Sequence, residues 1–388
     1  MDAILSSTLK LQEHIRTNGY KGYDPYDTLL SPYFKLPILR SRIIRFGAQQ
    51  VCKRIPINLR RILLVKKGLN PVTIGLCIQA YSYLGKAIPS DEEFYKKEID
   101  FLLDLLVQNK STGYSGFCWG YDFDWEARYT KINAYVPTSV ATGIITNSLF
   151  ESYLIFPNEK IKEIILDASN FVLKDLNRSY EGELFCFSYS PVDNQFVLNA
   201  SLKAARLLSQ AYYFNLDPEL KKTAKIAVQY VTQVQRENGS WPYAMHDART
   251  WADNYHTGYN LDCIDAYMTL CQDNEYNPEF EKGLHFYVNH FFEKEGIPKF
   301  YDNKTYPIDS TAAAQSLLSL SRFGYLDLAK NVALWMGKNM QDKNGGFYFR
   351  IHKHYKDKNI FMRWNNAWMF AGLSYFLYQN KSIGHGNK

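Results

Sequence analysis

Cysteine is scarce in this sequence and follows no recognisable pattern. The six cysteines among 388 residues form no Cys-x-x-Cys pair and no framework spacing, so we expect reduced, mostly buried thiols. The opening residues, MDAILSSTLKLQEH, show no basic leader followed by an apolar core, and no apolar run is long enough to span a bilayer. These absences exclude a disulfide scaffold and favour a cytoplasmic protein.

Acidic residues are missing between Arg40 and Lys67, where nine Lys or Arg residues interleave with apolar ones. This pattern predicts amphipathic structure rather than disorder. Such a segment could make peripheral contact with the inner membrane, a lipid-linked glycan or an anionic polysaccharide, or it could be an ordinary solvated helix face. No nucleic-acid-binding motif accompanies the run, so nucleic acid is not an expected partner.

Aromatic residues, by contrast, are abundant, at 16% of the chain with 30 tyrosines. Tyrosine combines a flat apolar face with a polar tip, which suits the lining of a wet cavity, although large helix interfaces also use such residues. The densest stretch is QRENGSWPYAMHDARTWADNYHTGY, residues 235–259, and helical sequence flanks it on both sides. Its content of Tyr, Trp, His and Asp exceeds what a turn requires, so it indicates a ligand site.

The glycines reveal an internal repeat. Gly182, Gly239 and Gly296 are each 57 residues apart, with Gly116 before them and Gly346 after them. Aromatic residues follow each glycine, then a polar loop, then a helical segment rich in Ala, Ser and Leu. Segments with one charged face separate the units and should form outer helices.

Six such helix pairs predict an all-α fold, an (α/α)6 toroid of inner and outer helices with Gly/aromatic-rich loops at one rim. We expect one domain over residues 1–388, of which 1–68 is a less regular basic portion. An open helical solenoid uses the same pair logic and is the competing arrangement. In the toroid, the inner helix N-termini would meet at one mouth and favour an anionic or hydroxyl-rich ligand.

Two motifs resemble those of terpenoid cyclases and protein prenyltransferase β subunits. QRENGSW (235–241) fits their QxxxGxW pattern, and QDKNGGF (341–347) is a close variant. In that fold the motif ties an outer helix to the next inner one, so Trp241 is expected to be a structural wedge. The resemblance therefore implies a toroid more than a reaction.

DNYHTGY (253–259) is similar to the segment that holds the zinc-bound histidine of prenyltransferase β subunits. VDNQ (192–195) stands where that family has Asp-x-Cys, so Gln195 replaces the thiolate ligand. Because an amide is a poor zinc donor, we predict no metal site and no cofactor. The DxDD motif of the cyclases is also missing, with only Asp122 and Asp124 forming a DxD. An isoprenoid enzyme remains the second interpretation.

GYDFDW (120–125) and DNYHTGY also resemble segments of poorly characterised toroid proteins from bacterial surface-polysaccharide clusters. Six-hairpin glycosidases, polysaccharide lyases and uronyl epimerases share the toroid. The resemblance implies a cytoplasmic carbohydrate-active enzyme of epimerase, lyase or glycosidase type, acting on a sugar or uronate. A non-catalytic toroid that binds a glycan or a partner is the third interpretation.

The candidate site residues follow from these chemistries. Glycosidases need two carboxyl groups, whereas epimerases and lyases need proton-transfer groups and a cation for the uronate carboxylate. The catalytic candidates are Asp253, His256, Tyr243, His246, Asp124 and Glu126. The substrate-binding candidates are Trp119, Trp125, Arg128, Asp193, Arg249, Trp251, Tyr255, Tyr259, Arg350, Arg363 and Trp364.

Several of these residues have a purely structural alternative. His256 could cap backbone N–H groups, and Asp253 could be a helix N-cap, as Asp309 is expected to be. Asp124 and Glu126 could simply pair with Arg128. The histidines of RIHKHYKDK, His352 and His354, are expected to be solvated rather than functional.

Overall fold

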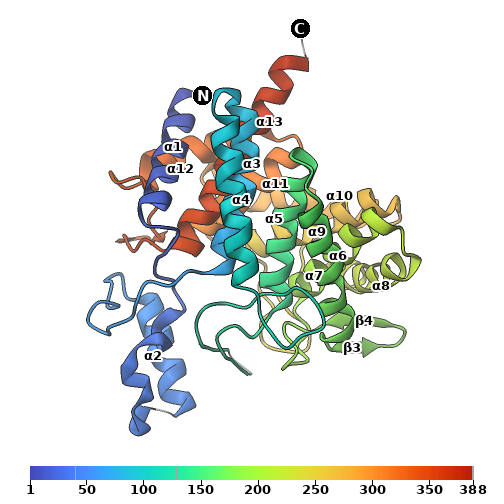
Figure 1. Cartoon of the computed structure of the whole chain (residues 1–388), viewed down its shortest axis with the longest axis horizontal. Helices are drawn as coiled ribbons and strands as arrows, with labels where there is room; N and C mark the ends of the chain where they lie inside the picture. The colour runs from blue at the N-terminus through green and yellow to red at the C-terminus, as the bar shows by residue number, and fades with distance from the viewer. Residues whose placement is uncertain (40, 128–129, 387–388) are drawn as a thin grey trace.

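In the computed structural model, which describes residues 1–39, 41–127 and 130–386, six helices form a closed inner ring. Each contacts the next in chain order, and the last returns to the first (Figure 1). The predicted toroid is confirmed, and the closure excludes an open solenoid. The inner helices are α3 (Pro71–Ala87), α5 (Ser139–Ile155), α7 (Leu198–Asn215), α9 (Asn254–Cys271), α11 (Ser310–Arg322) and α13 (Trp368–Gly386).

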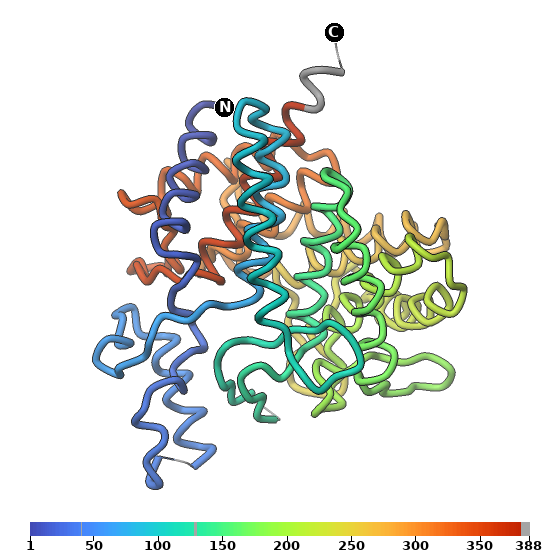
Figure 2. Tube along the Cα trace, viewed as in Figure 1, coloured from blue at the N-terminus to red at the C-terminus, as the bar shows by residue number. Residues whose placement is uncertain are grey.

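The outer helices alternate with the inner ones and run antiparallel to them (Figure 2). Five follow their inner partners in sequence, as the charged faces predicted. The sixth is the N-terminal helix, which packs against α12 and α13 and so closes the outer layer. These helices are α1 (Asp2–Thr17), α4 (Glu92–Gln108), α6 (Glu159–Lys174), α8 (Pro218–Gln233), α10 (Asn277–His290) and α12 (Leu326–Met340).

Small residues let the inner helices approach one another closely. A Cβ placed on Gly143 of α5 would lie 2.7 Å from Cβ of Lys203 on α7, so only glycine fits there. Side-chain caps fix where inner helices begin: Thr138 accepts from Ala141 N–H, and Asp309 accepts from the N–H groups of Thr311 and Ala312. The cap predicted for Asp309 is thus confirmed. All six cysteines are buried and free.

The two QxxxG motifs perform the structural role that their resemblance implied. Gln235 Nε2 donates to Gly239 O at 3.0 Å and to Glu279 O at 2.8 Å, while the buried Trp241 donates to Val231 O at 2.9 Å. The second motif repeats this geometry, since Gln341 Nε2 donates to Gly345 O and to Ser7 O. Through that last bond it fastens α1 into the ring.

The connections preceding the inner helices gather at one end of the ring, where short strands stiffen them. Antiparallel pairs join β1 (Trp125–Glu126) to β2 (Lys131–Ile132) and β3 (Arg178–Glu181) to β4 (Leu184–Phe187). A third sheet orders β5 (Ile308–Asp309), β6 (Arg350–Ile351) and β7 (Lys356–Asp357). A π-helical turn, η6 (Met362–Ala367), leads into α13. The N-terminus and the coloured part of α13 extend towards the opposite end (Figure 2).

Residues 31–68, hereafter the basic lobe, project from the end of the ring at which these connections lie (Figure 1). The lobe contains the short turns η2 (Pro32–Lys35) and η3 (Pro37–Leu39) and the helix α2 (Arg42–Arg54), and it follows η1 (Asp27–Leu30). α2 packs on η1 and β1. The predicted amphipathic segment is therefore helical over its first half only, and Arg40 lies outside the described residues.

Candidate functional site

Asp253 and His256 form a hydrogen-bonded pair where α9 begins. Asp253 Oδ1 accepts from the backbone N–H of His256 at 3.0 Å, which makes Asp253 the N-cap. Its Oδ2 lies 2.7 Å from His256 Nδ1 and also accepts from Trp251 Nε1 at 3.2 Å. Asp253 is 2% exposed, whereas the His256 side chain is 17% exposed. The carboxylate thus caps the helix and orients the imidazole, and Nε2 is left for a ligand.

Aromatic rings surround this imidazole. The ring centroids of Tyr243, Tyr255 and Tyr259 lie 4.6, 4.1 and 5.9 Å from that of His256. Trp251 stacks on the outer face of Tyr243 at 5.5 Å. Burial is the main cause that raises the pKa of each of these three tyrosines. They stay neutral hydroxyl donors, a lining suited to a sugar.

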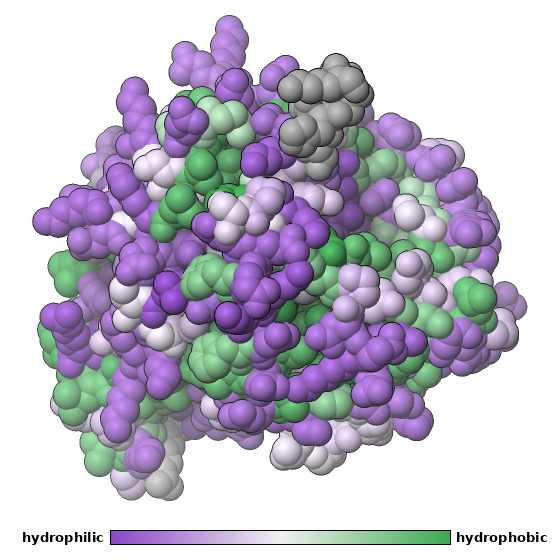
Figure 3. Space-filling view, turned by 45° about the horizontal axis from the view of Figure 1, so that its top comes forward, coloured by the Kyte–Doolittle hydropathy of each residue, from purple (hydrophilic) through white to green (hydrophobic). Residues whose placement is uncertain are grey.

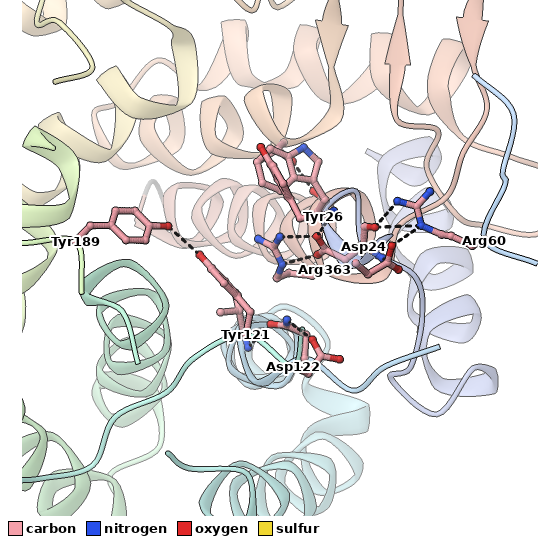
Figure 4. A network of polar contacts seen from close by, with 12 residues as sticks. Asp24, Tyr26, Arg60, Tyr121, Asp122, Tyr189 and Arg363 are labelled. Atoms are coloured by element: carbon pink, nitrogen blue, oxygen red, sulfur yellow. Dashed lines mark hydrogen bonds and ion pairs between the residues drawn. The ribbon is translucent and has the colours of Figure 1, made fainter. Parts of the chain in front are cut away.

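A second polar cluster lies at the same end of the ring, which we call the mouth. It comes mainly from the N-terminal residues and η6. Arg363 holds Asp24 with two hydrogen bonds of 2.7 and 2.9 Å, and its guanidinium lies over the Tyr121 ring at 4.7 Å. The hydroxyls of Tyr121 and Tyr189 lie 3.4 Å apart (Figure 4). Below them, burial raises the pKa of Asp122 to about 6, although Asn70 donates to that carboxyl group.

Trp364 joins the two clusters. Its ring contacts Tyr255 at 6.0 Å on one side and Tyr26 at 5.5 Å on the other. Lys53 of α2 reaches into this junction: its ammonium lies 4.1 Å from the Tyr26 ring centroid and donates to the Tyr26 hydroxyl. Burial, reinforced by the charge of Arg350, lowers the pKa of Lys53 to about 7. The basic lobe therefore forms part of the mouth.

Two further cations lie against these aromatic rings. Arg350 pairs with Asp309 at 2.6 Å and lies over the rings of Phe300 and Phe349. Lys203, from α7, lies with its ammonium 3.5 Å from the Tyr259 ring centroid, and burial together with Arg206 lowers the pKa of Lys203 to about 7. The mouth thus combines aromatic faces with two arginines paired to aspartates and two lysines whose pKa values are lowered.

Two of the predicted catalytic carboxylates lie elsewhere on the rim. Asp124 accepts from Ala134 N–H at 2.9 Å and pairs with Lys131 at 3.2 Å, both within its own hairpin. Glu126 is fully buried and pairs with Arg45 of α2 at 2.5 Å. These contacts engage both carboxylates, and the Glu126–Arg45 pair ties the rim hairpin to the basic lobe. The predicted partner Arg128 lies outside the described residues.

Other predicted residues have structural partners. Trp119 is 0% exposed and donates to Leu106 O, so it belongs to the core. Asp193 accepts from the N–H groups of Tyr189 and Gln195 within its own turn. His246, in a left-handed conformation, pairs with Glu181 of β3 at the exposed edge of the rim.

The remaining predicted residues are close to the mouth or at the surface. Arg249 pairs with Asp247 and lies over the Tyr243 ring at 5.2 Å, and Trp125 contacts both Tyr26 and Tyr189. His354 is exposed and His352 is partly exposed. Among the described residues, no group of three or more His, Cys, Asp or Glu side chains is placed to hold a metal ion.

Sequence reasoning missed six residues of the mouth. Lys53 is one of nine basic residues in the run from Arg40 to Lys67, and nothing in the sequence distinguishes it from the others. Asp24 and Tyr26 belong to the irregular N-terminal portion. Tyr121 and Tyr189 lie in the rim loops, and Lys203 lies on an inner helix. The GYDFDW segment was a signal for Tyr121, but no local pattern marks a residue that becomes functional only when distant segments meet.

Comparison with known proteins identifies the fold. No protein-family model matches this sequence, and no curated protein is significantly similar to it. Solved structures do match: a cellobiose 2-epimerase from Bacillus thermoamylovorans has 11% identity and a TM-score of 0.63, over 81% of this chain and 90% of that chain. An unsaturated glucuronyl hydrolase specific for heparin has 13% identity and a TM-score of 0.62, over 98% and 97%.

A GH76 α-mannanase from Bacteroides thetaiotaomicron is also similar, with 12% identity and a TM-score of 0.57 over 80% of this chain and 87% of that chain. These three structures are six-hairpin α/α toroids, and this chain has the same fold. At such low identity the likeness concerns the fold alone.

Proposed function

We propose that this protein is a carbohydrate-active enzyme that moves a proton on a sugar or uronate at the mouth of the toroid. The observation that carries the proposal is the Asp253–His256 pair, with His256 Nδ1 held at 2.7 Å by a buried carboxylate. Such a carboxylate fixes the tautomer of the imidazole and stabilises the imidazolium that forms when Nε2 takes a proton. The fold shared with sugar epimerases and hydrolases supports the same conclusion.

In the reaction that we propose, His256 Nε2 removes a proton from the substrate. For an epimerase or lyase this is the hydrogen on the carbon beside a carbonyl or carboxylate, and its electron pair passes into that group as an enolate. Return of a proton from the opposite face gives the epimer, whereas loss of a substituent from the next carbon gives elimination. The cations of the mouth offset the charge of the enolate.

We further propose that the substrate is acidic, because the Lys53 ammonium and the Trp364 indole N–H lie close together at the mouth. Within the described residues, Lys53 forms no ion pair with a carboxylate, and the buried Nε1 of Trp364 has no hydrogen-bond partner. A buried donor without a partner is costly, so a ligand acceptor that reaches it gains affinity. A uronate carboxylate supplies both an acceptor and a negative charge.

The isoprenoid alternative has less support. An isoprenoid enzyme needs an apolar cavity and a diphosphate clamp, but this mouth is lined by tyrosine hydroxyls and charged groups. The two aspartates of the DxD are also engaged separately, Asp122 with Asn70 and Asp124 with Ala134 and Lys131.

The biological setting that we propose is the cytoplasmic assembly of bacterial surface polysaccharide. The GYDFDW and DNYHTGY segments support this role, as does the basic lobe, which would allow peripheral contact with the membrane or with a lipid-linked glycan. No helix in the described residues is long and apolar enough to cross a membrane.

The test is a turnover screen of the purified protein with neutral disaccharides, uronate-containing oligosaccharides and their unsaturated forms, in deuterated water. Incorporation of solvent deuterium at a sugar carbon shows proton removal from that carbon, and mass spectrometry with NMR locates it. We expect incorporation or cleavage with a uronate substrate and its loss in His256→Ala. Binding that is unchanged in His256→Ala, with no turnover of any substrate, would instead support the non-catalytic toroid.

A further inference from the structure

The basic lobe exposes aliphatic side chains to a degree found nowhere else in the described residues. Ile43, Ile38 and Ile62 are 83, 79 and 71% exposed, the three highest values among the large hydrophobic residues. Six more of the lobe's large hydrophobic residues are exposed, namely Tyr33, Leu36, Ile44, Val51, Ile57 and Leu64. Solitary exposed apolar residues are ordinary, but such a concentration on one projection marks an interaction surface.

The helix of the lobe has two distinct faces. Ile43 and Val51 lie eight residues apart on the outward face, the spacing that keeps side chains on one side of a helix. On the inward face, Gln49 and Cys52 are buried and Arg45 pairs with Glu126. The inward face explains how the lobe is attached to the rim. The outward face packs on nothing within the described chain.

The cations of the lobe also divide into an inward group and an exposed group. Arg60 is buried and pairs with Asp27 at 2.7 Å, and Lys53 donates to Tyr26 in the mouth, so neither of these two cations belongs to the outer surface. Arg54, Arg61 and Lys66 are exposed. No Asp or Glu occurs anywhere from residue 31 to residue 68. The outer surface is therefore aliphatic and positively charged, without a compensating acidic group.

We propose that the outer surface of the basic lobe is a docking site for an anionic phospholipid bilayer. The isoleucines would enter the boundary between headgroups and acyl chains, while the arginines and lysines pair with lipid phosphates. Figure 3 shows apolar and hydrophilic residues mingled over the lower-left corner, where the lobe lies, rather than an unbroken apolar patch of the kind that buries a second protein.

Docking of the lobe would also determine where the mouth lies relative to the bilayer. Because Lys53 joins the lobe to Tyr26 in the mouth, a docked lobe places the mouth beside the headgroups. The docking surface is independent of the proton-transfer chemistry. It goes beyond that chemistry in assigning a partner to residues that contact no substrate.

Flotation with two kinds of vesicle tests the proposal, one of phosphatidylcholine alone and one of phosphatidylcholine mixed with phosphatidylglycerol. We expect the full chain to bind the anionic vesicles and to be released by salt. Ile38→Ser/Ile43→Ser/Ile62→Ser, and separately Arg54→Gln/Arg61→Gln/Lys66→Gln, should each weaken binding at least ~10-fold. Thermal melting should be unchanged, since all six side chains are exposed.

A matched control replaces exposed aliphatic residues elsewhere, Leu154→Ser/Val192→Ser/Leu334→Ser, and should bind as the natural chain does. Three results overturn the proposal: no binding to either vesicle, equal loss in the control, or binding that the lobe substitutions leave unchanged. Concentration-dependent self-association that the isoleucine substitutions abolish, without vesicle binding, would overturn it in favour of an interface with a second copy. None of these readings depends on sugar turnover.

Discussion

Two polar clusters lie towards opposite ends of the inner helices, and their charged groups have different partners. Away from the mouth, Arg322 pairs with Glu151, which also accepts from Tyr83 at 2.9 Å. Nearby, Asp262 accepts from Gln315 and Ser319 at 2.6 and 2.9 Å. Burial alone would raise the pKa of Glu151, but the Arg322 guanidinium, together with the Tyr83 hydroxyl and Arg206, outweighs it and lowers that pKa.

At the mouth, two titratable groups are engaged in a different way. His256 uses one ring nitrogen for Asp253 and leaves the other, while Lys53 rests on aromatic faces rather than on a carboxylate. Burying a charge is tolerated when it is paired, and it is costly otherwise. The far cluster therefore pairs its arginine with a carboxylate, whereas Lys53 in the mouth has no carboxylate partner within the described residues.

The largest expected effect comes from removing the imidazole. His256→Ala should lower turnover by ~10²–10⁴-fold, since general acid–base groups contribute on that scale, with little change in the free energy of unfolding. Asp253→Asn, which keeps a cap but removes the charge, should lower turnover less and leave the helix intact. Steady-state kinetics and urea unfolding measure both quantities. A mouth that binds a ligand without catalysis would show no turnover in the natural chain or in either variant.

Breaking the far ion pair should produce the opposite result. Arg322→Ala leaves the Glu151 carboxylate, whose side chain is 12% exposed, without its cation and should lower the free energy of unfolding by ~1–3 kcal/mol. Turnover per folded molecule should change little, because the pair lies towards the other end of the ring. Glu151→Leu/Arg322→Leu should recover part of the stability. Urea unfolding checks the energies, and a selective loss of turnover in the folded fraction would contradict the division between the clusters.

Lys53, at the mouth, should make the free energy of unfolding depend on pH. Because the pKa of Lys53 is lowered to about 7 from an ordinary 10.5, the unfolded chain binds a proton that the folded chain lacks between these values. Stability attributable to Lys53 therefore rises with pH through this window, by ~1–3 kcal/mol between about pH 7 and pH 9.

Lys53→Met should remove that rise, although Lys203 contributes a similar one that persists, since the pKa of Lys203 is also lowered to about 7. Urea unfolding at a series of pH values measures the difference between the two curves. Lys66→Gln, at an exposed position of the same lobe, is the control and should keep the slope of the natural chain. An unchanged slope in Lys53→Met would mean that the mouth does not hold this ammonium away from water.

The smallest effect is expected at the rim hairpin. Asp124 pairs with Lys131 where both side chains are more than a third exposed, and such pairs contribute little to stability. Asp124→Asn should alter turnover less than ~2-fold and the free energy of unfolding by under ~1 kcal/mol. Kinetics and unfolding on the same preparation suffice. A loss comparable to that of His256→Ala would return Asp124 to the catalytic group.

The candidate site could be predicted where one local segment supplied it. Asp253, His256, Tyr255 and Tyr259 follow one another at the start of α9, so the sequence showed their density. Asp253 was open to two interpretations, cap or functional acid, and the structure shows that it caps the helix and binds His256 as well. His256 does not use its side chain as a cap, since that side chain binds Asp253.

The sequence by itself determined the helix pairs, their inner or outer character and the QxxxG turns, because periodicity, caps and turn residues act over a few neighbouring positions. Tertiary structure alone decided that the ring closes and that α1 serves as the sixth outer helix. It also decided that Asp24 meets Arg363 across 339 residues and that Lys53 enters the mouth. These outcomes depend on how large surfaces pack together, and packing joins residues that no local pattern relates.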